Sequence, residues 1–532
     1  MGDVEKAMGK RWKSACKVLF GQELGGMEKY VSWLLENNDP IVRRKSSLSG
    51  KEVSFAAGDY AEGSKWVSFD EVDFGKKSEP ISPNDLKDIN SLASALQERF
   101  SYCGNIILGN SGFVEKSSNI SDSFYMNCAG KLGDCKYISH TTLGRLCEDC
   151  FGCNGIGESK VCVKCYETFR DNRCLEVWMC QRCSDLYYCH NLSSSQDCMF
   201  SFNLKGARNM IGNVQLEQGQ YRKIKAALLG QMKDELEAKK RLPSLVELAG
   251  SAPIHAPPEF SGWKAVHEPK MDADIAPIEK AFRNACRVVL GSELPGSVKD
   301  YAEWLQRHTQ AHEKCASAAS GKAVHRRDYC CYFLIPRNRL LTAAEAQSLG
   351  PSLKMNGEEL GRLNFDSIPQ SLGNIAYFAS EYLDGTNRNL IECATSTDSS
   401  SCLRCSPVIY SKYCAYSFWP RSCEHAFGCQ TIFDSEFCIN CYQSVKLKRC
   451  AECDNCRDCS DSYFCHNAEN CRDCMFCFNV KNLKFAIGNA EVGREKFMEA
   501  KEALLKWMNE SLSKTHGLKT DIYNVGCAKK KR

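Results

Sequence analysis

The chain has 532 residues, of which 43% are hydrophobic and 25% are charged. This is an ordinary globular composition, and at roughly 100–200 residues per domain the length allows two to four domains. The net charge of +4 is too weak to indicate a nucleic-acid-binding protein by itself.

The first residues form no apolar core of a secretory signal, and no stretch approaches the roughly 18 apolar residues of a membrane span. We therefore expect a cytoplasmic protein without a membrane partner. The 35 cysteines stand apart from this ordinary composition. A chain of this length needs no disulfides to make up for a small core, and cytoplasmic thiols stay reduced. We predict reduced cysteines that are buried or bound to metal; disulfides would require an extracellular location.

The sequence is an internal tandem duplication. Shifting it by 276 positions aligns Cys147 with Cys423 and continues without a gap to Asn213 and Asn489. A slightly smaller shift aligns the N-terminal parts, where the matches are Cys16–Gly21 with Cys286–Gly291, Trp33-Leu34 with Trp304-Leu305, and Ser49-Gly50-Lys51 with Ser320-Gly321-Lys322. The duplicated unit is therefore the whole half-chain, and we call the halves the first and the second copy.

Each copy begins with a helical segment, in which apolar residues recur at helical spacing on both sides of a Gly25-Gly26 break. A mixed segment that we assign as α/β follows, and then the cysteine-rich array. A closing helix ends each copy with one apolar stripe. The residues are Trp12, Cys16, Leu19, Tyr30, Trp33 and Leu34 in the opening helices, and Tyr221, Ile224, Leu228, Leu229, Met232 and Phe497, Ala500, Leu504, Leu505, Met508 in the closing helices.

These elements predict an α+β fold in which each copy has a helical or α/β head, a cysteine-rich β-solenoid-like array and a C-terminal capping helix. Pro243, Pro253 and the prolines after them lie in a stretch without helical or strand periodicity, which indicates a linker. The expected segments are the first head at 1–125, the first array with its helix at 126–240, the linker at 241–275, the second head at 276–390, the second array with its helix at 391–515, and a basic tail at 516–532.

The cysteines of the array follow a three-residue register. In the second copy, Cys405, Cys423, Cys441, Cys459 and Cys477 are spaced by eighteen. A helix needs a period of 3.6 and a simple strand a period of 2, so neither explains the pattern. An eighteen-residue coil of a β-solenoid would stack equivalent residues roughly 4.8 Å apart, and cysteine suits a narrow interior. Asn and Asp that precede many cysteines, at 440, 455, 458, 470 and 473, suit the turns.

Two pairs of Cys-x2-Cys in each copy predict a structural zinc site. Fourteen residues separate the pairs, which is close to the usual spacing of a two-knuckle zinc site, and four thiolates match the tetrahedral preference of zinc. The eight candidate ligands are Cys162, Cys165, Cys180, Cys183, Cys438, Cys441, Cys456 and Cys459.

Free stacked thiols are the alternative to zinc. The duplication supports packing at four positions, because a small residue that cannot ligate zinc stands opposite a cysteine in the other copy. The pairs are Cys453 with Val177, Cys471 with Ser195, Cys477 with Ser201, and Cys150 with Ala426. Val177 also argues against an iron–sulfur interpretation of the run from Cys450 to Cys459.

Other motifs have a structural interpretation that we prefer. His190 and His466, each within Cys-His-Asn, suit hydrogen-bonded turn histidines better than ligands or bases. The repeated Ser-Gly-Lys predicts a tight turn rather than an anion site. The chain has no Gly-x4-Gly-Lys-Ser/Thr loop and no Gly-x-Ser-x-Gly elbow, so we predict no enzyme.

The array carries Phe-Gly-Cys at Phe151–Cys153 and Phe427–Cys429 and leaves through Ile-Gly-Asn into a helix. With its dense Cys-x2-Cys steps it resembles uncharacterised cysteine-rich repeat proteins of archaea and candidate-phylum bacteria. The resemblance covers roughly residues 147–235 and 393–510. It implies no activity.

These observations favour a non-enzymatic scaffold that self-assembles or docks on a large complex. The alternative is a zinc-stabilised factor that binds RNA or the ribosome, as the paired knuckles and the basic tail Lys529–Arg532 would suit. A thiol-based redox or metal-storage protein would need accessible cysteines of low pKa. We infer no small-molecule substrate.

Overall fold

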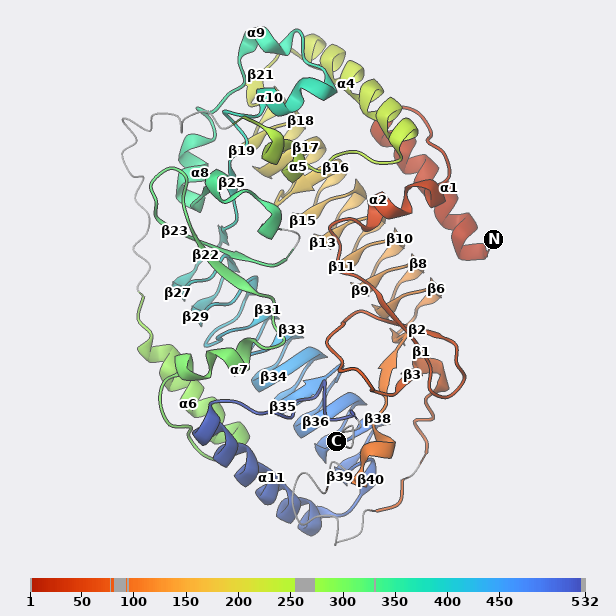
Figure 1. Ribbon diagram of the computed structural model, residues 1–532, viewed down its shortest axis with the longest axis vertical. Coiled ribbons are helices and arrows are strands. Elements are labelled where there is room, and N and C mark those ends of the chain that lie inside the picture. Colours follow the sequence, from red (N-terminus) through yellow and green to blue (C-terminus); the bar gives the residue numbers. More distant parts are fainter. Residues whose placement is uncertain are drawn as a thin grey trace.

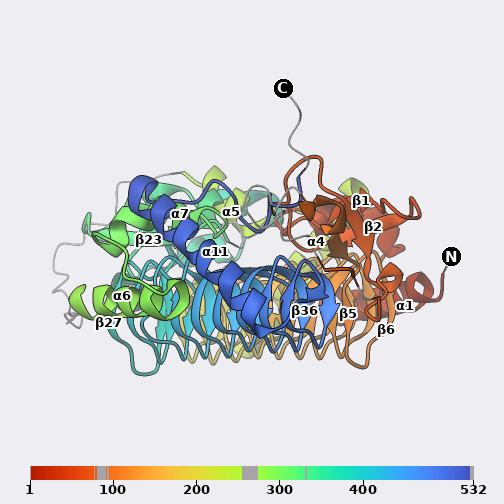
Figure 2. The same cartoon turned by 90° about the horizontal axis from the view of Figure 1, so that it is seen from below.

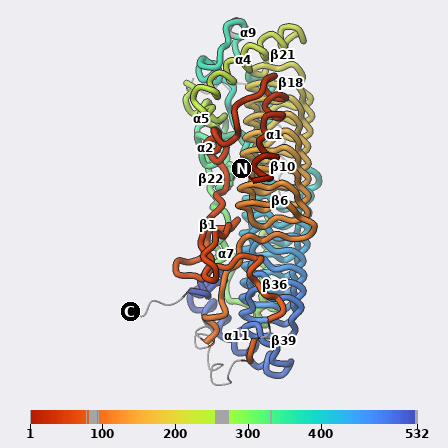
Figure 3. Tube along the Cα trace, turned by 90° about the vertical axis from the view of Figure 1, so that its right-hand side faces the viewer, coloured from red at the N-terminus to blue at the C-terminus, as the bar shows by residue number. Residues whose placement is uncertain are grey.

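The computed structural model describes residues 2–76, 78–80, 92, 95–253, 273–329 and 332–527. Two long arrays of short strands lie side by side and run in opposite directions (Figure 1). Helices and irregular segments gather on one side of both arrays. In the part of the chain that the structure describes, the opposite edge of the arrays is covered by no other element (Figures 2 and 3).

The first copy contributes a 17-stranded sheet, β5 to β21. Nearly all of its strands are parallel and four residues long. Their bounds are β5 Ile107–Leu108, β6 Gly112–Glu115, β7 Ser118–Ser121, β8 Phe124–Asn127, β9 Gly130–Gly133, β10 Lys136–Ser139, β11 Thr142–Arg145, β12 Glu148–Phe151, β13 Asn154–Gly157, β14 Lys160–Val163, β15 Tyr166–Phe169, β16 Asn172–Trp178, β17 Ser184–Ser193, β18 Gln196–Met199, β19 Phe202–Lys205, β20 Arg208–Ile211 and β21 Val214–Gln215.

The second copy contributes a 13-stranded sheet and the parallel pair β27–β29. Their bounds are β26 Tyr382–Asp384, β27 Arg388–Ile391, β28 Thr395–Thr397, β29 Ser400–Leu403, β30 Val408–Ile409, β31 Phe418–Arg421, β32 Glu424–Phe427, β33 Gln430–Phe433, β34 Glu436–Val445, β35 Lys448–Asp454, β36 Ser460–Glu469, β37 Arg472–Met475, β38 Phe478–Lys481, β39 Lys484–Ile487 and β40 Ala490–Glu491.

Most parallel-paired strands in both arrays are twelve residues apart in the chain, while β5 with β7 and β26 with β28 are thirteen apart. Cys150 pairs with Cys162, and Cys162 pairs with Cys174. The backbone takes a positive φ at every third residue, as at Lys164 and Glu167, and these residues form the corners of each twelve-residue turn. Every third side chain therefore points inward, and the inward positions of successive turns stack in columns of cysteines, small residues and aliphatic side chains such as Leu132 and Ile156. The Asn and Asp residues expected in turns, at 440, 455, 458, 470 and 473, all have positive φ.

The predicted fold class is wrong. The strands do not form eighteen-residue coils below a separate head; they form two large parallel sheets with a twelve-residue register. Inward positions recur every three residues, so cysteines spaced by nine or eighteen are compatible with a twelve-residue turn. Most inward cysteines donate their thiol to the backbone carbonyl of residue i+9, as Cys153 does to the carbonyl of Cys162, 3.4 Å away.

Helices line the arrays and close them. α1 and α6 each lie along their own copy's array, and α4 and α11 follow its last strands (Figure 1). The bounds are α1 Asp3–Phe20, α2 Val31–Leu35, α4 Gln218–Lys239, α5 Leu245–Ser251, α6 Ala276–Leu290, α7 Ala302–Gln306, α8 Ala343–Leu349, α9 Gly357–Leu360, α10 Ile368–Ser371 and α11 Arg494–Thr515. The Phe-Gly-Cys glycines meet the ends of α2 and α7. A Cβ on Gly152 would lie 2.8 Å from the Leu34 carbonyl, and one on Gly428 would lie 2.7 Å from the Leu305 carbonyl.

Each head also carries short strands. These are the hairpins β1 (Val42–Lys45) with β2 (Glu52–Phe55) and β22 (His312–Ala316) with β23 (Ala323–Arg327), and the parallel pairs β3 (Trp66–Ser68) with β4 (Tyr102–Gly104) and β24 (Leu340–Leu341) with β25 (Phe378–Ala379).

Each copy packs part of its head on the array of the other copy, whereas α1 and α6 stay on their own arrays; we call this arrangement the exchange of heads. The amide of Cys103, in the first head, donates to Nε2 of His466 in the second array at 2.8 Å. The amide of Ala379, in the second head, donates to Nε2 of His190 in the first array at 3.1 Å. Cys103 and Ala379 are 276 positions apart, and so are His190 and His466. The contacts are thus equivalent and reciprocal.

Both large hydrophobic cores contain residues of both copies as a result. One joins the first array to residues 324–379, and the other joins the second array to residues 53–102. Side-chain amides extend the exchange: Asn203 donates to the Tyr377 carbonyl and Asn479 to the Ser101 carbonyl, each at 2.8 Å.

Two segments expected to be irregular are partly ordered. α5 lies inside the expected linker, and the buried carboxylate of Glu176 accepts the Leu245 amide at its first turn, 3.2 Å away. In the expected tail, Ile522 and Tyr523 are buried, and the Ile522 carbonyl accepts the Tyr102 hydroxyl at 2.6 Å. Residues 254–272 and the basic end Lys529–Arg532 lie outside the described residues.

Candidate metal centre

The eight cysteines predicted to bind zinc are all buried inward residues of the arrays. The twelve-residue register places Cys162 between Cys150 and Cys174, and not over Cys180 as an eighteen-residue coil would. In the second copy Cys438 pairs with Cys450, and Cys441 with Cys453. Each predicted tetrad is therefore divided between two successive turns, and not every member lies beside another cysteine: the residues twelve positions from Cys180 are Thr168 and Leu192.

The thiols of these cysteines donate to backbone carbonyls. Cys165 donates to the carbonyl of Cys174 at 3.4 Å, and Cys183 donates to that of Leu192 at 3.5 Å. Burial raises the pKa of the Cys165, Cys180 and Cys183 thiols well above the ordinary value, whereas in Cys456 burial is outweighed by hydrogen bonds with Cys453 and Cys459, which lower its pKa to about 5. Zinc requires thiolates, so it would have to displace both protons and hydrogen bonds here. Zinc binding by these eight residues stays a prediction.

The two Cys-His-Asn histidines are structural hydrogen-bond acceptors, as the exchange contacts show. His466 also contacts Asp454 through Nδ1 at 2.8 Å, inside the core. Both Ser-Gly-Lys sequences are tight turns, as expected: Gly50 and Gly321 have φ of 75° and 74° and donate to the carbonyls of Ser46 and Ser317.

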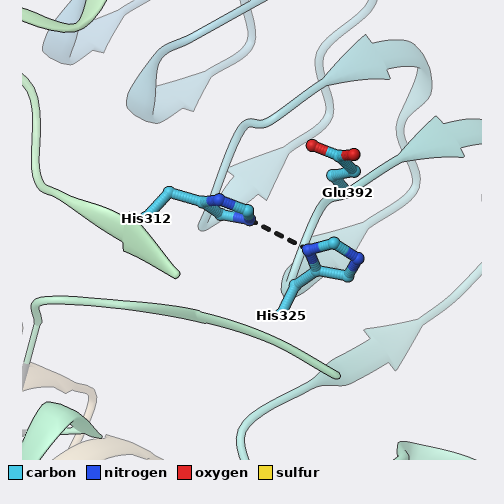
Figure 4. A group of neighbouring side chains, drawn as sticks. All are labelled: His312, His325 and Glu392. Atoms are coloured by element: carbon cyan, nitrogen blue, oxygen red, sulfur yellow. Dashed lines mark hydrogen bonds between the residues drawn. The ribbon is translucent and has the colours of Figure 1, made fainter. Parts of the chain in front are cut away.

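A different group of residues has the geometry of a metal site. Within the described residues, one set of three His, Cys, Asp or Glu side chains brings its ligand atoms within 4.8 Å of one another: His312, His325 and Glu392 (Figure 4). His312 and His325 project from β22 and β23, and Glu392 follows β27. Nε2 of His312 lies 3.0 Å from Nδ1 of His325.

All three groups are in the protonation state that binds a cation. Burial lowers the pKa of His312 to about 3 and also lowers that of His325, and the nearby Arg327 and Arg404 act in the same direction. Burial alone would raise the pKa of Glu392, but the hydrogen bond and charge of Arg404 bring it below its ordinary value. At neutral pH the site therefore offers two neutral imidazoles and a carboxylate.

This donor set suits zinc or another first-row transition ion. Two imidazole nitrogens bound to tetrahedral zinc at about 2.0–2.1 Å would lie roughly 3.3 Å apart, close to the separation of the two histidines. Arg404 donates to one oxygen of Glu392 and leaves the other for the ion, while it fixes the carboxylate as an outer partner does in metal sites. The positive charges of Arg327 and Arg404 oppose a cation and limit its affinity.

The first copy cannot form the same site. The hairpins align with a shift of 271, since Arg43 pairs with Ser54 and Lys314 with His325. The array aligns with a shift of 276. Ile41, Ser54 and Lys116 therefore stand where the second copy has His312, His325 and Glu392.

Sequence reasoning missed this site because its ligands are far apart in the chain and belong to no spacing motif. Comparison of the copies contained the signal. Two of the ten histidines of the chain lie opposite Ile41 and Ser54 in a duplicated hairpin.

Comparisons with known proteins add no identity to this geometry. No family model, no curated protein and no solved structure matches the chain. Among the described helices, none is long and apolar enough to cross a membrane.

Proposed function

We propose that this protein is a non-enzymatic scaffold that self-assembles or docks on a larger complex, and that a single transition-metal ion, zinc in the first instance, clips its second head to its second array. The observation that carries the proposal is the convergence of His312, His325 and Glu392 at the joint between hairpin and array. The ion would cross-link His325 and Glu392, which are 67 positions apart in the chain. It would thereby fix the second head, part of which packs on the first array.

The scaffold part rests on the exchanged heads and on the uncovered edge. Reciprocal contacts fix the two arrays side by side as one body. Corner residues of successive turns on the uncovered edge form ion pairs, such as Arg170 with Glu158 at 2.7 Å and Lys446 with Asp458 at 3.8 Å. A long, straight surface of mixed charge suits docking or self-association more than catalysis.

Metal titration of chelator-treated, reduced protein tests the proposal. We expect one zinc per chain by calorimetry and elemental analysis, and stabilisation of about 2.7 kcal/mol at a free zinc concentration 100 times the Kd. H325A and E392Q should abolish the stoichiometric binding and the rise in Tm. H516A, which removes an exposed histidine away from the site, is the matched control.

Cobalt distinguishes this site from the cysteine tetrads. Co²⁺ at His312, His325 and Glu392 has no sulfur ligand, so it should show no thiolate charge-transfer band. A strong band that survives H325A and disappears with C162S/C165S or C438S/C441S would assign the metal to the array instead. Light scattering on the same samples should show particles above the chain mass of 59.6 kDa that grow with protein concentration. A monomer at every concentration, without metal at the three residues, would refute the proposed function.

A further inference from the structure

One groove beside α6 differs from its counterpart beside α1. In the first copy, Arg11 of α1 lies over the ring of Tyr137, with its guanidinium carbon 4.4 Å from the ring centre. The same guanidinium binds Asp149 at 2.6 Å and Glu148 at 3.2 Å. The ring of Tyr125 stacks against Tyr137, with centroids 4.9 Å apart. Side chains of the protein thus fill the space between helix and array.

The second copy lacks three of these side chains, those of Arg11, Asp149 and Tyr125. The helices align with a shift of 270, so Ala281 stands where the first copy has Arg11. At the shift of 276, His425 replaces Asp149, Ser401 replaces Tyr125, and Tyr413 keeps the place of Tyr137. A cavity of about 720 Å³ opens here, lined by Lys280, Arg283, Arg287, Asp274, Tyr413 and His425 among others.

Aromatic rings line the array side of this cavity. The rings of Tyr413 and His425 lie 5.4 Å apart, and Phe437 stacks on His425 at 4.4 Å. His425 is 8% exposed, and its Nδ1 lies 3.6 Å from a carboxylate oxygen of Glu424. Ser401 in place of Tyr125 leaves Tyr413 without the second stacked ring that Tyr137 has in the first copy, and a flat ligand would take the place of that ring.

The helix side of the cavity is basic. Lys280, Arg283 and Arg287 line it, and Arg283 lies 4.0 Å from Glu279 of the same helix. Asp274 and Glu293 are the acidic residues of the lining, and Glu293 is paired with Arg287. The site thus combines ring surfaces with an excess of cationic side chains, which is the pattern that binds bases and phosphates of single-stranded nucleic acid.

We propose that this groove binds a nucleoside phosphate, with the base against the ring of Tyr413 and the phosphate at Lys280, Arg283 and Arg287. The same chemistry is presented by a free nucleotide and by one nucleotide of a single strand. The inference is independent of the metal-clipped scaffold, because the groove shares no residue with the metal centre.

The first copy supplies the decisive variant. A281R/H425D rebuilds the Arg11–Asp149 arrangement in the second copy and fills the groove, and it replaces a neutral pair by an opposite-charge pair. We expect it to weaken binding at least 10-fold without changing the circular dichroism spectrum. K280A/R283A changes two surface residues and should weaken binding and reduce its salt dependence. V288R adds an arginine to an exposed position of α6 outside the groove and should not weaken binding.

The probes are a fluorescein-labelled ten-nucleotide oligouridine, followed by anisotropy in the presence of EDTA, and unlabelled AMP and UMP as competitors. Binding of the oligouridine with competition by the mononucleotides identifies a free nucleotide as a sufficient ligand. Binding of the oligouridine without such competition assigns the site to a strand. Absence of binding by every probe, or equal binding by the parent chain and by A281R/H425D, would overturn the proposal.

Discussion

His190 acts as a neutral hydrogen-bond acceptor. His190 lies fully buried between the two copies and accepts the Ala379 amide, and burial lowers its pKa to about 3. The sequence pattern Cys-His-Asn indicated a hydrogen-bonded histidine, but its partner is 189 positions away and belongs to the other copy. No local pattern could identify that partner, since the contact arises from the exchange of heads.

The pH dependence of stability should report His190. Its folded pKa lies below the unfolded value of about 6.5, so its contribution is fully present above pH 6.5 and is lost as the pH falls toward 3. Because His190 stays neutral in the folded protein, the free energy of unfolding at pH 5 should be about 2 kcal/mol lower than at pH 7. In H190Q, whose side-chain carbonyl can still accept the Ala379 amide, the difference in unfolding free energy between pH 7 and pH 5 should shrink by that amount. Guanidinium unfolding at both values measures it, with H516Q as the control; an unchanged difference would contradict the assignment.

At the scale of the strand, the cysteine pattern predicted the three-residue register of the array but not the length of its turn. The three-residue register of the inward residues is present in the sequence, and residues such as Asn440 and Asp458 do form corners. The sequence does not define the number of residues per turn, because turns of nine, twelve or eighteen residues would all place every third side chain inward. Only the pairing of Cys150 with Cys162, and of Cys438 with Cys450, fixes it.

An inward residue of one array should be replaceable by the residue at the equivalent position of the other array. Cys453 stacks between Cys441 and Cys465, and Val177 occupies the equivalent place in the first array. C453V should therefore cost less than about 1.5 kcal/mol, as a near volume-conserving change does, although it removes a thiol contact to the Ser462 carbonyl. C453L adds volume that neither copy accommodates and should cost about 1–3 kcal/mol more. Urea unfolding of both variants provides the measurement, and equal losses would show that the column does not discriminate by volume.

At the scale of the whole molecule, the sequence showed the duplication but did not predict the exchange of heads between the copies. The constant shift of 276 relates the contact of Cys103 with His466 to that of Ala379 with His190. A chain in which each head covered its own array would show the same sequence symmetry. The choice between the two arrangements depends on how residues 52–105 cross to the other array, and that path has no periodic signature.

The exchange predicts that neither half is a complete folding unit. Residues 1–253 alone would lose the second array, and with it the hydrogen bond of Tyr60 to Asp454 at 2.7 Å and the core around Tyr102. Residues 273–527 alone would lose the first array, against which residues 324–379 pack. Each half expressed separately should expose these apolar surfaces and aggregate or unfold at a lower temperature.

Co-expression should restore a one-to-one complex with the circular dichroism spectrum of the intact chain, because the linker residues 254–272 need not be continuous for the contacts to form. Size-exclusion chromatography with light scattering decides the matter: two halves that are each monomeric, folded and indifferent to one another would show that the copies do not depend on exchanged heads.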